Sequence, residues 1–449
     1  MVTPTPDTEP GSVGQESLCR LSKLAQEDPA RKFSSIAHLL TPQGLMEAFT
    51  SLRRQSSAGV DAVTYRDYEE QADQNVQKLW ERLRQGAYRV KPLRRIYIPK
   101  EDGKQRAISI PALEDKIVQK ATVRLLNAIF ETDFLDCSYG ARPGRNAHQA
   151  LDEVDRQIFR RSITHVLELD IVSYFDAIVR GALMEMIERR INDRSLLRLI
   201  GKWINVGVID EGRLLCSETG IGQGQVISPF LANVYLHNVL DRWFEDVVKP
   251  RLRGQAFLVR YMDDAVICFQ NEQDAQKVLR VLGKRMEKYG LALHPQKTRL
   301  IEFGRRALMT ARKLRRKPET FDFLGFTHVS AWSRSGKYTT WVRTMRKRLR
   351  RGLRDVAQWC KANRHRPVGE QQAALNAKLR GHYQYYGRSS NHRRIRQFYN
   401  AVRLIWRKWL DRRSRAGRLS FRAYGHFLQR HPLLLPRITH SWASLRSPS

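Results

Sequence analysis

The stretch LVRYMDDAVICF, residues 258–269, sets two adjacent carboxylates between two apolar runs. Such runs predict two buried β-strands, and the polar pair between them predicts a tight turn. Neighbouring strand residues point to opposite faces, but at a turn two side chains can flank one site. An unpaired buried carboxylate is costly, so Asp263 and Asp264 either form a solvated turn or lie beside a cation. The apolar runs on both sides favour the cation.

A third carboxylate stands at the end of another apolar run. Asp170 closes the stretch VLELD, which predicts a buried strand. Carboxylates at the ends of central strands can hold divalent cations, and Mg²⁺ prefers a few carboxylates together with substrate phosphates. Two such ions about 4 Å apart can activate a 3′-hydroxyl and stabilise a leaving pyrophosphate. The three aspartates therefore predict a two-metal centre.

The charge balance indicates a polyanionic partner. The chain has 80 Lys and Arg against 45 Asp and Glu, a formal net charge of +35. Such an excess favours nucleic acid as the partner first and an anionic membrane surface second. No apolar run reaches the roughly 18 residues that a membrane-spanning helix needs. The N-terminal stretch MVTPTPDTEPGSVGQES lacks the charged and apolar regions of a signal peptide.

The five cysteines are scattered along the chain without a CxxC pair. This spacing argues against a zinc site or a disulfide framework and suits a reducing cytosol. We therefore expect a cytoplasmic protein without a membrane partner.

Local patterns divide the chain into four parts, and its length predicts two or three domains. Residues 1–30 begin with a Pro-, Thr-, Gly- and Ser-rich stretch and are expected to be a disordered tail. Residues 31–95 predict helices. Residues 96–332 alternate strands and helices, beginning with a hairpin around the polar turn EDGK and a helix over 113–133. Residues 333–449 predict basic helices.

The C-terminal part combines apolar helix faces with a strong excess of cations. Between Arg343 and Arg415 there are 22 Lys and Arg against three acids. Two helical faces follow the apolar spacing, one of Met345, Leu349, Leu353, Val356 and Cys360 and one of Ile395, Phe398, Val402, Ile405 and Trp409. Aromatic residues interleave with the cations and are candidates for base stacking, namely Tyr383, Tyr385, Tyr386, Trp406 and Trp409. Phe398 and Trp409 also fit the apolar core, which is the alternative for them.

The motifs occur in the order of a known family. RYMDD resembles the catalytic motif of reverse transcriptases, and residues 35–440 resemble the group II intron reverse transcriptases and maturases. The resemblance is carried by SAGVDAVTY, IYIPKEDGKQRAISIPALEDKIVQ, CSYGARPGRNAHQAL, LDIVSYFDAI, GIGQGQVISPFLANVYL, GLALHPQKT, FDFLGF, LRGHYQYYG and LPRITHSW. The order of the motifs is more specific than any single one.

The resemblance implies roles for residues around the metals. Asp170, Asp263 and Asp264 would hold two Mg²⁺ ions, with the backbone carbonyl of Ile171 as a further ligand and Mn²⁺ as a substitute. Lys297 would protonate the pyrophosphate, and a solvated lysine is the alternative for it.

It also implies residues that bind the nucleotide. Phe175 would lie under the sugar and exclude a 2′-hydroxyl, with core packing as the alternative. Lys100 and Arg106 would clamp the triphosphate, with a solvated hairpin as the alternative, because cations stabilise charge that develops on phosphate. Gln223 would form a hydrogen bond near the sugar. Asp176 fits a structural role better than that of a metal ligand.

The fold implied by the resemblance is α+β. A right-hand polymerase, with fingers and an antiparallel-sheet palm over residues 96–332, would be followed by an all-helical thumb or maturase domain over 333–449. Residues 31–95 would extend the fingers. The implied partners are an RNA template or intron RNA, a DNA primer and dNTPs. The oligomeric state stays open, with a dimer as one alternative.

The chain departs from the family pattern in three places and in its length. Met262 stands where alanine is common, Gly222 where proline is common, and Gln225 where glycine is common. These changes affect the expected fit around primer and template but leave the metal ligands in place. Because the chain ends at Ser449, soon after the expected thumb, a DNA-binding region and an HNH endonuclease are not expected.

Three functions stay open at this point. The first is an RNA-directed DNA polymerase that also binds its intron RNA and aids splicing. The second is an RNA-binding splicing cofactor without polymerase activity, against which the intact Asp170, Asp263 and Asp264 argue. The third is a reverse transcriptase adopted by its host for DNA repair, defence or CRISPR spacer acquisition.

Overall fold

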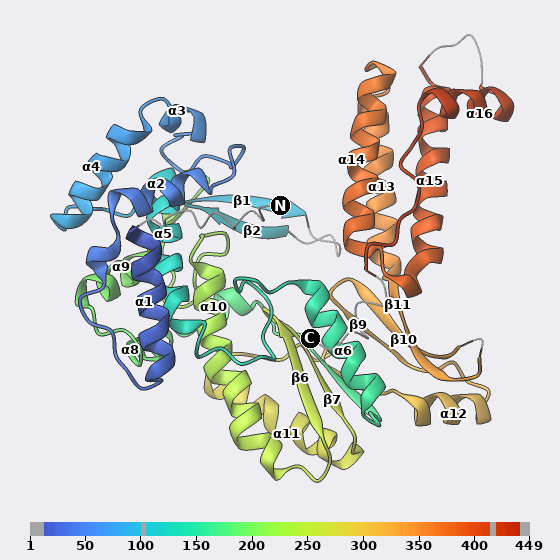
Figure 1. Cartoon of the computed structure of the whole chain (residues 1–449), viewed down its shortest axis with the longest axis horizontal. Helices are drawn as coiled ribbons and strands as arrows, with labels where there is room; N and C mark the ends of the chain where they lie inside the picture. The colour runs from blue at the N-terminus through green and yellow to red at the C-terminus, as the bar shows by residue number, and fades with distance from the viewer. Residues whose placement is uncertain (1–12, 100–104, 334, 414–418, 441–449) are drawn as a thin grey trace, which may run out of the picture.

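The computed structural model describes residues 13–99, 105–333, 335–413 and 419–440, and Figure 1 shows the arrangement of their helices and strands. Helices and largely antiparallel sheets build the chain, as the α+β prediction expects. The expected division into fingers, palm and thumb stays a prediction. The all-helical part expected over residues 333–449 is wrong near its start, because residues 338–344 form a strand.

Helices form most of the N-terminal part of the chain. They are α1 (Val13–Glu27), η1 (Ala37–Leu39), α2 (Pro42–Thr50), α3 (Tyr65–Glu69) and α4 (Ala72–Arg84). Two of them begin with side-chain caps, since Thr41 caps α2 and Thr64 forms a capping box with Asp67 at α3. These caps satisfy backbone N–H groups that a helix start leaves without partners.

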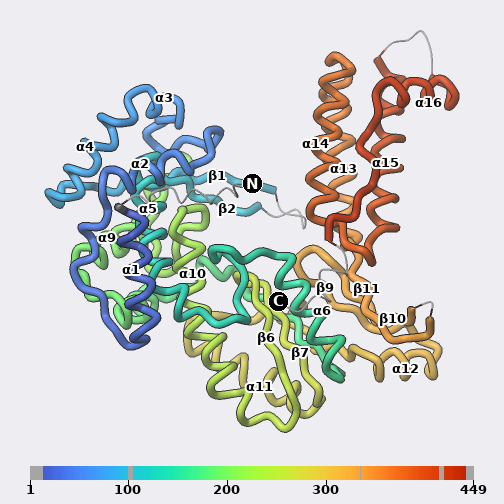
Figure 2. Tube along the Cα trace, in the orientation of Figure 1, coloured from blue at the N-terminus to red at the C-terminus, as the bar shows by residue number. Residues whose placement is uncertain are grey.

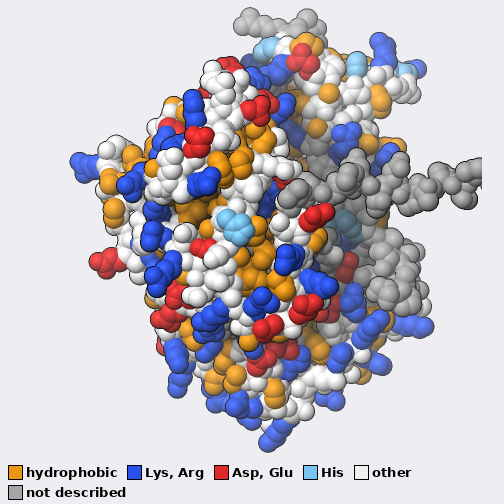
Figure 3. Space-filling view, turned by 60° about the vertical axis from the view of Figure 1, so that its left-hand side comes forward, with side chains coloured by type: hydrophobic (Ala, Val, Ile, Leu, Met, Phe, Trp, Pro, Cys, Tyr) orange, Lys and Arg blue, Asp and Glu red, His pale blue; other side chains and the backbone are white. Residues whose placement is uncertain are grey.

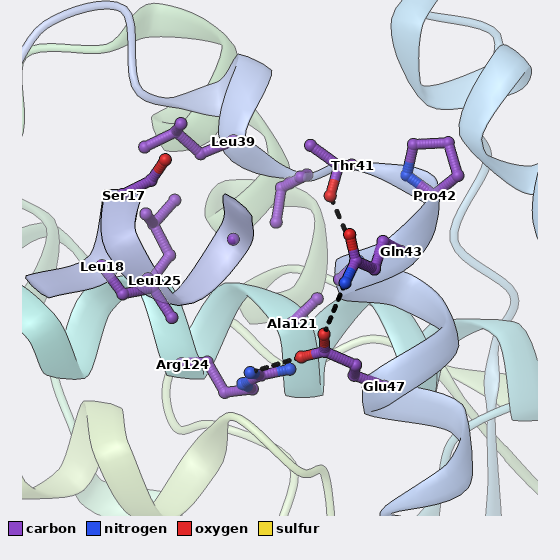
Figure 4. Close-up of a pocket in the computed structure, with 13 residues that line it drawn as sticks. Ser17, Leu18, Leu39, Thr41, Pro42, Gln43, Glu47, Ala121, Arg124 and Leu125 are labelled. Carbon is purple, nitrogen blue, oxygen red and sulfur yellow. Dashed lines mark hydrogen bonds and ion pairs between the residues drawn. The ribbon is translucent and has the colours of Figure 1, made fainter. Parts of the chain in front are cut away.

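The expected disordered tail over residues 1–30 is wrong for its described part, because residues 13–27 form α1. Leu21 and Ala25 of α1 are buried in the main core, and Leu18 packs against it. The polar composition of the first residues hid this helical spacing of apolar side chains. Figure 4 shows Leu18 lying beside Leu125 of α5 (Leu113–Phe130), where α1, α2 and α5 surround a pocket. Residues 1–12 lie outside the described residues.

The expected hairpin is present as β1 (Leu93–Pro99) and β2 (Gln105–Ile110). These strands pair antiparallel, with Ile96 opposite Ile108, and the EDGK turn lies outside the described residues. β1 also pairs in parallel with β4 (Val208–Asp210), which pairs with β5 (Arg213–Leu215). Helix α5 follows, as expected for residues 113–133.

The central sheet is antiparallel throughout, with the strand order β6-β7-β3-β8. Its strands are β3 (His165–Leu169), β6 (Ala256–Tyr261), β7 (Asp264–Phe269) and β8 (Arg299–Glu302). The chain between and after these strands forms helical segments, namely α6 (Ala147–Arg160), α7 (Tyr174–Ala177), α8 (Arg180–Glu188), α9 (Arg194–Ile204), α10 (Ser228–Leu236), α11 (Glu272–Lys288) and α12 (Arg305–Lys313). Both faces of the sheet are covered, since Leu167 and Ile267 belong to one apolar cluster and Val166 and Val266 to another.

The helix that begins at Ser228 changes its winding partway. α10 continues into the π-helical segments η2 (His237–Asp241) and η3 (Trp243–Val248), followed by the 3₁₀ turn η4 (Lys249–Arg251). A π-helical segment turns its side chains away from the direction that an α-helix would give them. In η2 this winding accompanies a fully buried Asp241.

A third sheet connects the central sheet to the C-terminal helices. Its order is β11-β10-β9, from β9 (Thr320–Phe323), β10 (Phe326–Trp332) and β11 (Tyr338–Thr344). The helices are α13 (Arg346–Ala362), α14 (Val368–Tyr386), α15 (His392–Leu410) and α16 (Phe421–Arg430), with the turn η5 (Ser389–Asn391) before α15. They enclose an apolar cluster of their own. Figure 2 shows α13–α15 rising beside the β9–β11 sheet, apart from the N-terminal helices.

The aromatic residues of these helices correct one expectation. Trp406 is fully buried, and its Nε1 donates a hydrogen bond of 3.0 Å to Oε1 of Gln371. Tyr383 is also buried, and its hydroxyl donates to the carbonyl of Leu434 at 3.0 Å. Neither ring can stack on a base as placed here. Phe398 is core, as its alternative assignment held, while Trp409 is only half-buried.

Candidate active site

The two adjacent aspartates lie at a tight turn between strands, as expected. Tyr261 pairs with Asp264 across the β6–β7 hairpin, which leaves Met262 and Asp263 as a two-residue loop. Met262 has a φ of 59°, the sign that favoured hairpin turns require at their first loop residue. A Cβ atom at Gly140 would lie 2.5 Å from the Met262 nitrogen, so the segment after α5 packs directly against this turn.

The strand register brings Asp170 to the same turn. Leu169 of β3 pairs with Ala265 of β7, and the chains run antiparallel. One step further along, Asp170 follows β3 and Asp264 begins β7, so these two residues occupy facing positions. Facing residues in antiparallel strands have Cα atoms about 4.5–5.5 Å apart. Side chains that lie far apart in the sequence therefore meet at one end of the sheet, beside Asp263.

The environment of the pair raises the pKa of both carboxyl groups. Burial raises the pKa of Asp263, the negative charge of Asp170 adds to the effect, and the positive charge of Arg106 opposes it. Asp264 keeps solvent access but is surrounded by protein atoms on most sides. This partial burial, followed by the charges of Asp263 and Asp170, raises its pKa to about 6, against a smaller opposing effect of Arg348. Carboxylates that repel one another in this way favour a bound cation.

Asp170 is held by the segment after α11. Its backbone carbonyl accepts hydrogen bonds from the N–H of His294 at 2.8 Å and from the hydroxyl of Thr298 at 3.3 Å. Its carboxylate forms an ion pair with Nζ of Lys297 at 3.2 Å. The next residue, Ile171, is buried and forms an isolated bridge with Leu293. The stretch LALHPQKT thus positions Asp170 and places a cation against it.

Arg260 supports the turn from its buried side, and the sequence patterns did not single it out. It is fully buried and donates to both carboxylate oxygens of Asp241, through Nε at 2.7 Å and Nη2 at 2.5 Å. Its Nη1 donates to Asn233 Oδ1 at 2.9 Å and to the carbonyl of Met262 at 3.0 Å, and Nη2 also donates to Ser138 Oγ. A lone basic residue inside an apolar strand was the available signal, since a buried cation requires such partners.

A cleft of about 430 Å³ opens beside the carboxylates. Asp170, Asp264 and Lys297 line one part of it, and Lys347 and Arg348 at the start of α13 line another. Acids and cations thus face the same space, which can accommodate metal ions together with a polyphosphate or a nucleic-acid backbone.

The described residues expected to bind the nucleotide lie on three connected segments. The carbonyl of Phe175 accepts from the N–H of Ile221 at 2.9 Å, and the carbonyl of Gln223 accepts from the N–H of Ser109 on β2 at 2.7 Å. The segment of residues 220–225 therefore joins the hairpin to the helical turn that carries Phe175. Arg106 is exposed on β2, and its positive charge opposes the raised pKa of Asp263. Lys100 lies outside the described residues.

Two departures from the family pattern explain one another. Gln225 is buried, accepts from Gln119 Nε2 at 2.9 Å and donates to the carbonyl of Trp203 at 3.1 Å. A Cβ atom at Gly222 would lie 2.6 Å from Leu93 Cδ1 and 2.9 Å from Gln225 Nε2. The glutamine thus occupies space that a proline at 222 would need.

The donor set suits a hard divalent cation in its chemistry, because carboxylate oxygens are the ligands that Mg²⁺ prefers. Within the described ranges, however, no three His, Cys, Asp or Glu side chains are grouped closely enough to hold a metal ion as they stand. Asp170 is engaged with Lys297 instead.

The positive charge of the chain is not confined to the C-terminal helices. Lys and Arg side chains, with acidic side chains between them, spread over the face shown in Figure 3. No helix among the described residues is long and apolar enough to cross a membrane.

A family model described as "Reverse transcriptase (RNA-dependent DNA polymerase)" matches residues 98–328, more than half of the chain. The matched region contains the end of β1, all of β2 to β9 and all three aspartates. The chain therefore belongs to the reverse transcriptase family.

Similar proteins include a group II intron-encoded protein and an intron maturase. Protein YkfC of Escherichia coli is 33% identical over 293 residues, which cover 58% of this chain and 77% of YkfC. Group II intron-encoded protein LtrA of Lactococcus lactis is 28% identical over 302 residues, covering 65% of this chain and 50% of LtrA. Nuclear intron maturase 4 of Arabidopsis thaliana is 24% identical over 241 residues, covering 53% and 28%. The chain thus spans about half the length of LtrA.

Proposed function

We propose that the protein is an RNA-directed DNA polymerase that adds dNTPs to a primer 3′-hydroxyl on an RNA template. The observation that carries this proposal is the register that sets Asp170 opposite Asp264, with Asp263 in the adjoining turn. The raised pKa values of Asp263 and Asp264 support it, since crowded carboxylates favour a divalent cation. In this proposal the matched family region supplies the fingers and palm, and α13–α16 supply the thumb.

Asp170, Asp263 and Asp264 hold two Mg²⁺ ions in this proposal, with the carbonyl of Ile171 as a further ligand. The ions would activate the primer hydroxyl and neutralise charge on the leaving pyrophosphate. The ammonium group of Lys297 forms an ion pair with Asp170. Lys297 is the proposed donor of a proton to pyrophosphate.

The remaining residues position the nucleotide in this proposal. Arg106 reaches the triphosphate from β2, and Lys100 assists it. Phe175 selects against a 2′-hydroxyl by contact with the sugar. Gln223, which is tied to β2 through its carbonyl, contributes a polar contact near the sugar.

The test is dNTP incorporation by the purified protein on poly(rA) primed with oligo(dT) in Mg²⁺. The wild type and an Asp263→Asn/Asp264→Asn variant are compared with Asp176→Asn as the matched control. Asp176 lies on α7 near the site, but its side chain is exposed. Incorporation lost only in the double variant supports the proposal. An inactive wild type in both Mg²⁺ and Mn²⁺, or an active double variant, contradicts it.

A second candidate activity is binding of intron RNA in aid of splicing. The relatives named as intron-encoded proteins and as a maturase support it, as do the cations of α13 and α15. It is tested by splicing of a flanking intron transcript with wild-type protein and with Asp263→Asn/Asp264→Asn. Splicing without polymerase activity in that variant supports a separate maturase function, and no effect of either protein on splicing contradicts it.

A further inference from the structure

A second basic groove lies away from the carboxylates, on the outer face of β11. It has a volume of about 700 Å³ and is bounded by β11, η5 and the first turn of α15. Thr340, Val342 and Thr344 of β11 point into the core, whereas Trp341 and Arg343, at alternate positions, line the groove. It shares no lining residue with the cleft beside Asp170 and Asp264.

The groove gathers positive charge without a balancing acid. Arg343, Arg393 and Arg394 line it together with His392, and its lining contains no Asp or Glu. Burial, followed by the charges of Arg394 and Arg393, lowers the pKa of Arg343, although an arginine still stays protonated. The first turn of α15 also contains no acid, and the N-terminal end of a helix is itself positive. Repulsion among these groups is relieved by a bound anion.

Neighbouring contacts hold the lining in shape. The guanidinium carbon of Arg343 lies 4.5 Å from the ring centre of Trp341, so the cation is stacked on an aromatic surface. Nη1 of Arg394 donates to Oε1 of Gln397 at 2.7 Å. The hydroxyl of Ser390 donates to the Val342 carbonyl at 3.0 Å, and its oxygen accepts from the Val342 N–H at 3.1 Å. These contacts orient two guanidinium groups before any ligand binds.

We propose that this groove binds the phosphodiester backbone of a nucleic-acid strand outside the catalytic cleft. Planar guanidinium groups match phosphate geometry, and three of them, spread over a strand and a helix, suit successive phosphates. The separation of the two lining sets makes this a second site, so a nucleic acid longer than the catalytic cleft accommodates would contact both.

The test compares two variants that lose the same charge. One is Arg343→Gln/Arg393→Gln/Arg394→Gln, and the other is Lys277→Gln/Arg280→Gln/Lys284→Gln on exposed positions of α11. Affinity is measured over a range of KCl concentrations for a blunt primer–template duplex and for the same duplex with a long single-stranded template extension. RNA and DNA extensions of one sequence form separate arms.

The groove variant is expected to bind the extended substrate roughly tenfold more weakly. The slope of log affinity against log KCl concentration should become about two units shallower, because each single-strand phosphate contact contributes about 0.7 to this slope. Binding of the blunt duplex stays unchanged, and the α11 variant behaves as wild type. A loss with both RNA and DNA extensions identifies the shared backbone as the ligand, and a loss with one alone restricts it to that polymer.

Several outcomes overturn the inference. They are unchanged binding of the extended substrate, an equal loss in the α11 variant, or full competition by polyglutamate, which would indicate attraction to any polyanion. The single Arg393→Gln variant, at an exposed position, serves if the triple variant does not fold. Primer extension on poly(rA) primed with oligo(dT) is followed in parallel, so failure of the proposed polymerase activity is distinguished from failure of this site.

Discussion

Two clusters of charged side chains lie on opposite sides of the β6–β7 turn, and their environments differ. On the buried side of the turn, Arg260 donates two hydrogen bonds to Asp241, and both residues are fully buried. Asn233 and Ser138 accept further hydrogen bonds from Arg260. On the cleft side of the turn, the like charges of Asp263 and Asp264 lie close together, and the pKa values of both carboxyl groups are raised. A matched buried pair is evidence for a structural role, whereas a mismatched cluster at a cleft indicates a ligand that is positively charged.

The largest expected effect comes from the cleft-side cluster of Asp263 and Asp264. Asp264→Asn should lower dNTP incorporation at least about a thousand-fold, because each metal ion contributes several kcal/mol to the transition state. Its melting temperature should stay unchanged or rise, since one repelling charge is removed. Asp176→Asn should keep wild-type activity and stability. A large loss of stability in Asp264→Asn would place this residue with the structural pair instead.

The buried cluster of Arg260 and Asp241 should show the opposite behaviour. Asp241→Leu leaves Arg260 buried without its carboxylate, which costs about 3 kcal/mol or more in the free energy of unfolding. Urea denaturation measures this loss. The double variant Asp241→Leu/Arg260→Met should recover most of it, because a buried ion pair can be replaced by apolar side chains of similar volume.

The same double variant sharpens the comparison further. It removes the hydrogen bond from Arg260 to the Met262 carbonyl, so the turn that carries Asp263 loses a support. We expect kcat to fall roughly tenfold, because small displacements of reacting groups lower rates, while KM changes little. Recovered stability together with wild-type kcat would limit Arg260 to a purely structural role.

A smaller effect is expected at the glutamine pair beside Gly222. Gln119→Leu removes the acceptor of the Val226 and Ile227 N–H groups and leaves Gln225 without its donor. Unsatisfied buried groups should cost about 2 kcal/mol in the free energy of unfolding. Gln119→Glu, which keeps an acceptor, is the comparison variant in the same denaturation experiment. Equal stability of wild type and Gln119→Leu would contradict this account of the pair.

The smallest effect is a shift with pH. The pKa of Asp264 is about 6, above its ordinary value of 3.8, so the native state holds a proton that the unfolded chain has released between these values. Its contribution to stability therefore falls as pH rises from about 3.8 to about 6. Metal binding needs the ionised form, so activity should decline as pH falls through about 6. Higher Mg²⁺ should move this decline to lower pH, and an unchanged midpoint would contradict metal binding at Asp264.

Much of the fold could be predicted from local patterns. Apolar runs around Asp263 and Asp264 predicted two strands and a turn, and the turn is present because such runs bury on both faces of a sheet. The spacing of Leu349, Val356 and Cys360 likewise predicted the buried face of α13. Local patterns were less reliable where composition was polar, as in α1, or where aromatic side chains interleave with cations. Trp406, a candidate for base stacking, lies only about 40° around α15 from the buried Val402 and is core.

The sequence by itself determined which segments become strands and helices and where the paired carboxylates stand, because these depend on neighbours a few residues away. Only the tertiary structure decided which distant groups meet. The register of β3 against β7 brings Asp170 to Asp264. The π-helical segment η2 carries Asp241 to Arg260, and η5 places the start of α15 against β11. Such pairings depend on long-range packing and on burial of opposite charges, which a local pattern does not encode.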